Sequence, residues 1–203
     1  LPDSAMASYA DDFTLLASSP SIDEAEAEAN RLMSTFVEWA VRKQLAIAPH
    51  KSSVTLFTPD THQSNLHPQL KIEDEVIPLE KTPKILGLVL DTHFTFGPHV
   101  RSLIQRASGS LRVLKALADT SWGFSKETLV GTYKAITRPI LDYGAPIWSH
   151  HVSRSNLERL SVVQNSALRV ATGNVMKAPI AHLEAEAGVL PLRRHLEACG
   201  AQF

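Results

Sequence analysis

The pattern of hydrophobic and polar positions changes its period near the middle of the chain. Up to residue 98, short apolar runs alternate with clusters of turn-forming residues, and one helical stretch interrupts them. From residue 99 onward, apolar residues recur at intervals of three and four, which is typical of helices that bury one face. The pattern therefore predicts an α+β chain, with strands and one helix in residues 1–98 and an all-helical region in residues 99–203.

The first expected element is a tight β-hairpin. Two short, β-compatible runs, "ASYA" and "FTLLA", flank Asp11 and Asp12. An amphipathic helix should follow, beginning with a capping box of Ser21 and Glu24 and ending near residues 45–48, before Pro49.

The rest of the first half reads as short strands joined by loops. Strands are expected at residues 53–58 and 84–91, and a small hairpin around the acidic turn at residues 73–75. The turn formers between residues 59 and 68 predict a loop.

The second half reads as a series of helices. Apolar spacing predicts a helix at residues 98–118. A second helix is expected at residues 125–137, beginning at Ser125, whose side chain can form an N-cap. Residues 138–149 mix aromatics with Pro and Gly, so we expect a packed, kinked segment. A further helix should begin with a capping box of Ser155 and Glu158 and end at Gly173, followed by two short helices at residues 178–187 and 191–198.

Composition narrows the class of protein. The hydrophobic fraction of 44% in 203 residues is sufficient for a buried core. The single cysteine, Cys199, allows no disulfide within the chain, and no apolar run approaches the 18 residues of a membrane span. We therefore expect an intracellular protein without a membrane segment.

Charge is distributed unevenly although the net charge is only −1. Residues 1–98 contain 7 Lys and Arg against 14 Asp and Glu, whereas residues 99–203 contain 13 against 7. Such an asymmetry fits an acidic catalytic half and a basic half that contacts phosphate. The alternative is an uneven distribution of surface charge without a functional role.

The adjacent carboxylates of Asp11 and Asp12 are candidate metal ligands. Like charges at this spacing repel each other, and a hard divalent cation such as Mg²⁺ removes the repulsion. Strand alternation predicts that Tyr9 and Asp11 face one side and Asp12 the other, unless the turn rotates them. This alternation favours Asp11 as the direct ligand and Asp12 as the secondary one. The alternative is an ordinary solvated Asp-Asp turn.

The order of these motifs resembles the reverse transcriptases of non-long-terminal-repeat (LINE-type) retrotransposons. The similarity begins at Tyr9-Ala10-Asp11-Asp12 and continues through the long helix, "PHKSSVTLF" and "KILGLVLD". Beyond these, "ILDYGAPIWS" and "LERLSVVQNSALRVATG" are similar to the helical segment that follows the catalytic palm in that family. The similarity extends from about residue 5 to about residue 200.

The resemblance implies a partial polymerase palm, an antiparallel sheet with a packed helix, in residues 1–98 and a thumb-like region in residues 99–203. The expected reaction is RNA-directed DNA synthesis with two Mg²⁺ ions, an RNA template, a DNA primer and deoxynucleotide triphosphates. Asp11 and Asp12 would hold the ions, Lys51 would steady the leaving pyrophosphate, and Tyr9 would lie under the primer end.

The resemblance also implies a role for two further residues and a location in the cell. Leu86 and Gly87 match the strand near the primer grip, where Gly87 either allows close approach of the backbone to the primer or simply eases packing. The expected location is the nucleus at the site of integration, and otherwise the cytoplasm.

One departure from the family concerns the residues upstream of the turn. The family has a further metal-binding aspartate on an earlier strand, but only eight residues precede Tyr9. We therefore expect a fragment that lacks the N-terminal part of its own polypeptide and is inactive alone. The alternatives are a degenerate, non-catalytic remnant with at most nucleic-acid binding, and a Mg²⁺-dependent phosphohydrolase.

A basic stripe is the remaining candidate site. Arg101, Arg112 and Lys115 fall within about 60° on a helical wheel. They could follow a nucleic-acid backbone or form a solvated helix face. The nine histidines and Cys199 show no zinc-type spacing.

Overall fold

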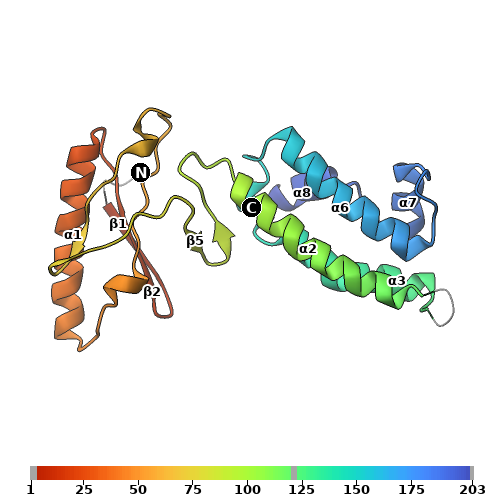
Figure 1. Ribbon diagram of the computed structural model, residues 1–203, viewed down its shortest axis with the longest axis horizontal. Helices are drawn as coiled ribbons and strands as arrows, with labels where there is room; N and C mark the ends of the chain where they lie inside the picture. Colours follow the sequence, from red (N-terminus) through yellow and green to blue (C-terminus); the bar gives the residue numbers. More distant parts are fainter. Residues whose placement is uncertain (1–3, 120–122, 202–203) are drawn as a thin grey trace. The chain divides into compact units, whose positions relative to one another are not determined.

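The computed structural model describes residues 4–119 and 123–201 and contains two compact units, residues 1–83 and 84–203 (Figure 1). The division lies before the expected boundary after residue 98, because Leu88, Leu90 and Phe96 pack into the core of the second unit. Within the described ranges, no helix is both long and apolar enough to cross a membrane.

The first unit begins with the expected hairpin. Strands β1 (Ser4–Tyr9) and β2 (Asp12–Ala17) pair antiparallel, with Tyr9 opposite Asp12 and Ser4 opposite Ala17. Only Ala10 and Asp11 connect the strands, and Ala10 has a φ of 53°. A two-residue loop needs such a left-handed residue to match the twist of the strands.

Helix α1 (Ile22–Arg42) packs against this hairpin (Figure 1). The Phe13 ring of β2 lies 4.9 Å from Phe36 and 5.8 Å from Trp39, centroid to centroid. The packing of the Phe13 ring against two aromatic rings of α1 therefore holds the hairpin on the helix.

Both ends of α1 differ from the prediction. Ser21 makes no side-chain cap, so the expected Ser21–Glu24 capping box is wrong; the Ser19 hydroxyl donates to Glu24 instead, at 2.6 Å. The helix ends earlier than expected because Gln44 adopts a φ of 58°, and the Leu45 amide then bonds back to the Ala40 carbonyl in a Schellman motif.

The remainder of the first unit is mostly irregular. It contains two 3₁₀ turns, η1 (Pro49–Lys51) and η2 (Gln63–Asn65), and the expected small hairpin of β3 (Lys71–Ile72) and β4 (Glu75–Val76). The strand expected at residues 53–58 is wrong: only an isolated bridge joins Val54 to Leu79. The Val54 amide donates to the Pro78 carbonyl and the Val54 carbonyl accepts from the Glu80 amide, but this pairing does not extend into a strand.

The second unit begins with a hairpin in place of the single strand expected at residues 84–91. Strands β5 (Lys84–Ile85) and β6 (Leu88–Val89) pair antiparallel across a turn at Leu86 and Gly87. The φ angles of these residues are 46° and 83°, so both are left-handed, as in the tightest hairpin turns. The single strand was expected because apolar residues continue through the turn, so the hydrophobic pattern does not mark where the chain reverses.

Seven α-helices lie in the described part of the second unit. Helices α2 and α6 lie side by side, and the others pack around them (Figure 1). Their bounds are α2 (Gly97–Leu117), α3 (Lys126–Thr132), α4 (Arg138–Asp142), α5 (Ala145–Trp148), α6 (Arg154–Thr172), α7 (Ile180–Ala187) and α8 (Leu192–Gly200). A π-helical stretch, η3 (Tyr133–Thr137), joins α3 to α4.

The apolar face predicted for α2 forms the centre of this unit. Val100, Leu103 and Ala107 are buried in one cluster, which residues of α4, α5, α6 and α8 complete. Leu114 is buried in a second cluster, with residues of α3, α6 and α7. The helix bounds also agree with the prediction to within one residue.

The caps of α3 and α6 test two sequence predictions. Ser125 caps α3, as expected, by accepting from the Thr128 amide. The Ser155–Glu158 capping box is wrong: Ser153 caps α6, and Glu158 pairs with Arg154. Gly173, with a φ of 67°, ends α6 as predicted.

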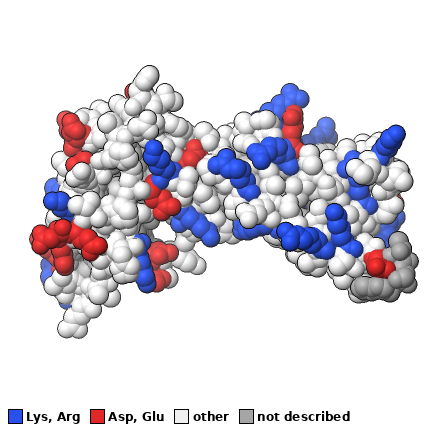
Figure 2. All heavy atoms as spheres, viewed as in Figure 1, with Lys and Arg blue, Asp and Glu red and all other residues white. Residues whose placement is uncertain are grey.

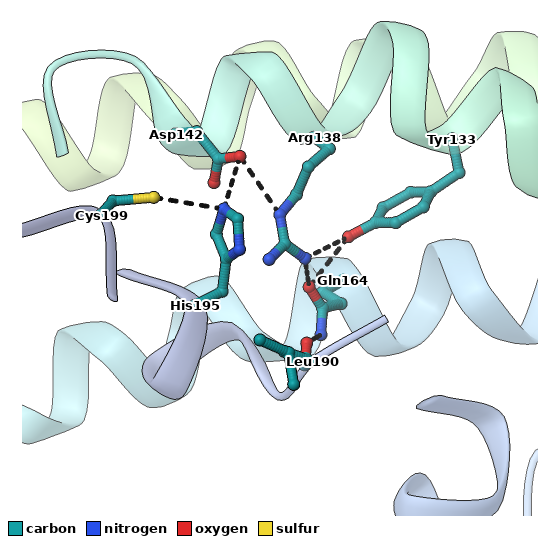
Figure 3. A network of polar contacts seen from close by, with 7 residues as sticks. All are labelled: Tyr133, Arg138, Asp142, Gln164, Leu190, His195 and Cys199. Carbon is teal, nitrogen blue, oxygen red and sulfur yellow. Dashed lines mark hydrogen bonds and ion pairs between the residues drawn. The ribbon is translucent and has the colours of Figure 1, made fainter. Parts of the chain in front are cut away.

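A buried polar network links four helical segments of this unit (Figure 3). The Arg138 guanidinium donates to Gln164 and Tyr133, and its Nε lies 3.3 Å from an Asp142 oxygen. His195 of α8 lies 2.9 Å from the same carboxylate. Burial raises the pKa of the Tyr133 phenol, which therefore remains a donor to Gln164 near neutral pH.

A second buried polar group is His99 near the start of α2. Its Nδ1 accepts from the Val89 amide at 3.3 Å, and its ring lies 5.6 Å from that of Trp148. Burial, with a smaller contribution from Arg106, lowers the pKa of His99 from 6.5 to about 4. The imidazole is therefore neutral near pH 7.

Candidate functional site

The β1–β2 turn presents two adjacent carboxylates to solvent. Asp11 occupies the turn and Asp12 begins β2, and both side chains are exposed. Within the described residues, no hydrogen bond or ion pair engages either carboxylate. The turn is short, and the aromatic packing of Phe13 on α1 holds its base.

The register of the hairpin corrects the expected placement of these side chains. Tyr9 and Asp12 are direct cross-strand partners, so they share a face, whereas Tyr9 and Asp11 were expected to do so. The reason is that Asp11 lies in the two-residue loop, where strand alternation does not continue. Phe13 marks the opposite face, which packs on α1.

These carboxylates fit part of a magnesium site. Mg²⁺ takes oxygen ligands and is commonly held by one or two carboxylates together with waters and substrate phosphates. The pair supplies such oxygens in an exposed position. Among the described residues, no group of three or more His, Cys, Asp or Glu side chains is arranged to hold a metal. The turn thus supplies a partial ligand set.

Lys51 lies at the end of the 3₁₀ turn η1, in the same unit as the two aspartates. Its side chain is exposed, and within the described residues no ion pair joins it to Asp11 or Asp12. Its expected role with pyrophosphate stays a prediction.

Leu86 and Gly87 form the exposed turn of the β5–β6 hairpin, in the other unit. Tyr143, which follows α4, donates a hydrogen bond from its hydroxyl to the Leu86 carbonyl at 2.6 Å. Sequence reasoning missed Tyr143 as a partner of this turn, since 57 positions separate the two residues. Its place in "LDYGAP", between a helix and a glycine, was the available signal.

An apolar hollow of about 810 Å³ lies beside this hairpin. Aliphatic and aromatic side chains line it, among them Leu86, Phe94, Phe96, Tyr143 and Ile147. Phe94 and Phe96 have φ angles of 52° and 53°. The hollow therefore lies among residues with left-handed backbone.

The basic stripe is present on α2. Arg101, Arg112 and Lys115 are all exposed, and no carboxylate of the described residues pairs with any of them. Lys and Arg predominate among the charged groups on the face of the second unit that Figure 2 shows. Over residues 84–203 there are 14 Lys and Arg against 8 Asp and Glu, so this unit carries the positive charge.

The sequence matches proteins encoded by mobile elements. It is 30% identical over 167 residues to the probable RNA-directed DNA polymerase from transposon BS of Drosophila melanogaster, covering 82% of this chain and 18% of that protein. It is 28% identical over 170 residues to the probable RNA-directed DNA polymerase from transposon X-element of the same fly, covering 84% and 18%.

A third relative is the RNA-directed DNA polymerase from mobile element jockey of Drosophila funebris, 28% identical over 168 residues, covering 83% of this chain and 18% of that protein. The chain therefore spans about a fifth of the length of these relatives. No protein-family model and no solved structure matches it.

Proposed function

Since this chain is homologous over most of its length to RNA-directed DNA polymerases of non-LTR retrotransposons, we propose that it carries the catalytic turn and the primer-contacting part of such an enzyme. The first unit would be the end of the palm, and residues 84–203 a thumb-like region. The observation that carries the proposal is the exposed Asp11-Asp12 pair on a tight, helix-backed hairpin.

The turn supplies part of the ligand set that nucleotidyl transfer would use. In the proposed reaction, the primer 3′-hydroxyl attacks the α-phosphate of a deoxynucleotide, and pyrophosphate leaves. Asp11 and Asp12 would hold Mg²⁺, which, when bound, stabilises the negative charge on the attacking and leaving oxygens. The short turn keeps the two carboxylates together, and the packing of Phe13 on α1 restrains their base.

Tyr9 would contact the primer end from the face it shares with Asp12. Their direct pairing in the register supports this role, because it places a ring and a carboxylate side by side on the exposed face. The alternation argument that preferred Asp11 as the direct ligand no longer applies, so we propose both carboxylates as ligands.

Substrate contacts would come from three further places. Lys51 would steady the leaving pyrophosphate as a point charge, and the Leu86-Gly87 turn would meet the primer. Arg101, Arg112 and Lys115 would contact the backbone of an RNA–DNA duplex through their exposed positive charges.

The described residues supply only two of the carboxylates that such a site would use. We therefore expect the 203-residue chain alone not to extend a DNA primer on an RNA template. Template-dependent extension by this chain in a primer-extension assay would contradict that expectation.

Metal binding at the turn is tested with Mn²⁺, whose paramagnetism broadens the NMR signals of nearby amides. In the presence of an RNA–DNA primer–template, Mn²⁺ should broaden the amide signals of residues 9–13, and the double variant Asp11→Asn/Asp12→Asn should abolish this broadening. The reason is that an amide cannot replace a carboxylate as an anionic ligand.

The chain offers a matched control in its other acidic hairpin turn, Glu73-Asp74 between β3 and β4. Substitution of Glu73→Gln and Asp74→Asn should leave the broadening at residues 9–13 unchanged. If the Asp11-Asp12 signals broaden no more than those of the Glu73-Asp74 turn, the site is an ordinary solvated turn. Duplex binding without metal at the turn would then indicate a non-catalytic remnant.

A further inference from the structure

The Leu86-Gly87 turn has a backbone that is costly for a leucine. Leu86 has a φ of 46° and is 52% exposed, so its side chain gains little burial in return. Left-handed backbone is unfavourable for a residue with a Cβ, because the Cβ comes close to the following carbonyl oxygen. Strain of this kind persists where surrounding contacts impose it, and it concentrates at sites that must hold a defined shape.

Tyr143 supplies the contacts that impose this shape. Its hydroxyl donates to the Leu86 carbonyl at 2.6 Å, and its ring lies against the Cα of Gly87. A Cβ built on Gly87 would lie 3.0 Å from Cε1 of that ring and 3.1 Å from its hydroxyl oxygen. A side chain at residue 87 would therefore make an unusually tight contact, and the Tyr143 ring would have to shift by a few tenths of an ångström to accept it.

Tyr143 is in turn anchored to the core of the second unit. The buried Trp148 donates from its indole Nε1 to the Tyr143 carbonyl at 2.8 Å. The next residue, Gly144, also packs closely against the hairpin: a Cβ on Gly144 would lie 2.6 Å from Cδ2 of Leu88 in β6. A continuous path of contacts thus runs from the buried indole through Tyr143 to the exposed turn.

Burial does not account for Tyr143 itself. The residue is 48% exposed, and in the described residues its hydroxyl bonds only the Leu86 carbonyl. Its main effect is therefore on the position of the Leu86-Gly87 turn and less on the stability of the core.

We propose that Tyr143 is a positioning residue that holds the Leu86-Gly87 turn in the shape in which it meets the primer end. The inference rests on the proposed function, because it assigns Tyr143 to the turn that would contact the primer. A loosely held turn would still touch the duplex, but it would not distinguish the recessed 3′ end that the reaction requires.

The test compares the affinity of the 203-residue chain for two labelled RNA–DNA duplexes of equal length, measured by fluorescence anisotropy with Mg²⁺ present. One duplex has a recessed DNA 3′ end, and the other is blunt. We expect the unmodified chain to prefer the recessed end about fivefold, the scale of one net hydrogen bond.

The variant Tyr143→Phe keeps the ring and removes only the donor. It should reduce the preference to less than about twofold while the affinity for the blunt duplex stays the same, which a general loss of folding would not do. Gly87→Ala, which pushes a methyl group against the ring at a φ of 83°, should have the same effect.

The matched control is Thr132→Val in the same unit. It removes another hydroxyl that donates to a backbone carbonyl, that of Thr128 at 2.9 Å, without touching the turn. This variant should keep the full preference for the recessed end.

The two hypotheses fail in different ways. An unmodified chain that binds neither duplex, or binds both equally, would overturn the proposed role of the Leu86-Gly87 turn and with it the role of Tyr143. An unmodified chain that prefers the recessed end, with Tyr143→Phe and Gly87→Ala equally selective, would overturn the role of Tyr143 alone.

Discussion

At the scale of single residues, left-handed backbone determines the shape of the two hairpin turns that the proposed function assigns to metal and primer. Ala10 closes the β1–β2 turn with a φ of 53°, and Leu86 begins the β5–β6 turn with a φ of 46°. Neither residue is glycine, so each turn has a conformational cost that its surroundings must offset. In the second turn Tyr143 provides the stabilising hydrogen bond, and in the first the packing of Phe13 on α1 restrains the base of the hairpin.

The buried imidazole of His99 predicts a loss of stability in acid. Its pKa is lowered to about 4 in the folded chain, against about 6.5 when unfolded, so between these values the unfolded state binds more protons. The free energy of unfolding should therefore fall as the pH decreases from 6.5 to about 4, by up to about 3 kcal/mol, and His99 should cause no further loss at lower pH.

Urea denaturation across this pH range measures the effect. His99→Asn removes the titrating group while offering an acceptor to the Val89 amide, so the variant should lack most of this pH dependence. His182→Asn, at an exposed histidine in the same unit, should keep it. Equal pH dependence in the unmodified chain and in His99→Asn would contradict the assignment.

At the scale of elements, α2 combines two functions on opposite faces. Its apolar face forms the centre of the second unit, and its exposed face carries the stripe of Arg101, Arg112 and Lys115. The stripe can therefore be changed without disturbing the core, because none of its side chains is buried.

Replacing all three stripe residues with Ala should weaken binding to an RNA–DNA duplex and make it less sensitive to salt. For every phosphate that the variant no longer neutralises, the slope of log affinity against log salt concentration should become shallower by about 1. Anisotropy titrations at several salt concentrations give this slope.

A suitable control for the stripe is Arg193→Ala on α8, where the exposed arginine pairs with Glu197. It should leave the slope unchanged. If the triple variant and the control have the same slope as the unmodified chain, the stripe is a solvated helix face.

At the scale of the whole molecule, a network of polar contacts joins distant segments of the second unit. Arg138 contacts Tyr133 and Gln164, and its partner Asp142 also contacts His195 (Figure 3). The Gln164 side chain further donates to the backbone carbonyl of residue 190, in the segment between α7 and α8. The network thus connects η3, α4, α6 and α8.

Arg138→Leu should destabilise the second unit by about 3–5 kcal/mol, because it leaves the half-buried Asp142 carboxylate and the buried Gln164 oxygen without their cationic partner. The free energy of unfolding in urea measures this change. Arg154→Leu removes an exposed pair with Glu158 and should cost less than about 1 kcal/mol. Similar losses of stability in the two variants would show that the network does not stabilise the unit.

The sequence predicted those features that depend on residues close together in the chain. The hairpin around Asp11-Asp12, the bounds of α2, the Ser125 cap and the Gly173 stop all agree with the structure. The two capping boxes failed because another serine, Ser19 or Ser153, competes for the same helix start. The palm and thumb assignment and the roles of the site residues stay predictions.

Local periodicity and motif order were enough to establish the α+β class, the adjacent carboxylates, the basic stripe and the kinship with mobile-element polymerases. Three other features became visible only once the chain was folded: Tyr9 shares a face with Asp12, residues 84–89 form a hairpin, and Tyr143 holds its turn. Tyr143 could not be predicted as the partner of Leu86 because their hydrogen bond joins segments 57 positions apart, which no local pattern records. The other two features were missed for local reasons: strand alternation stops in the two-residue loop that contains Asp11, and the apolar run continues through the Leu86-Gly87 turn.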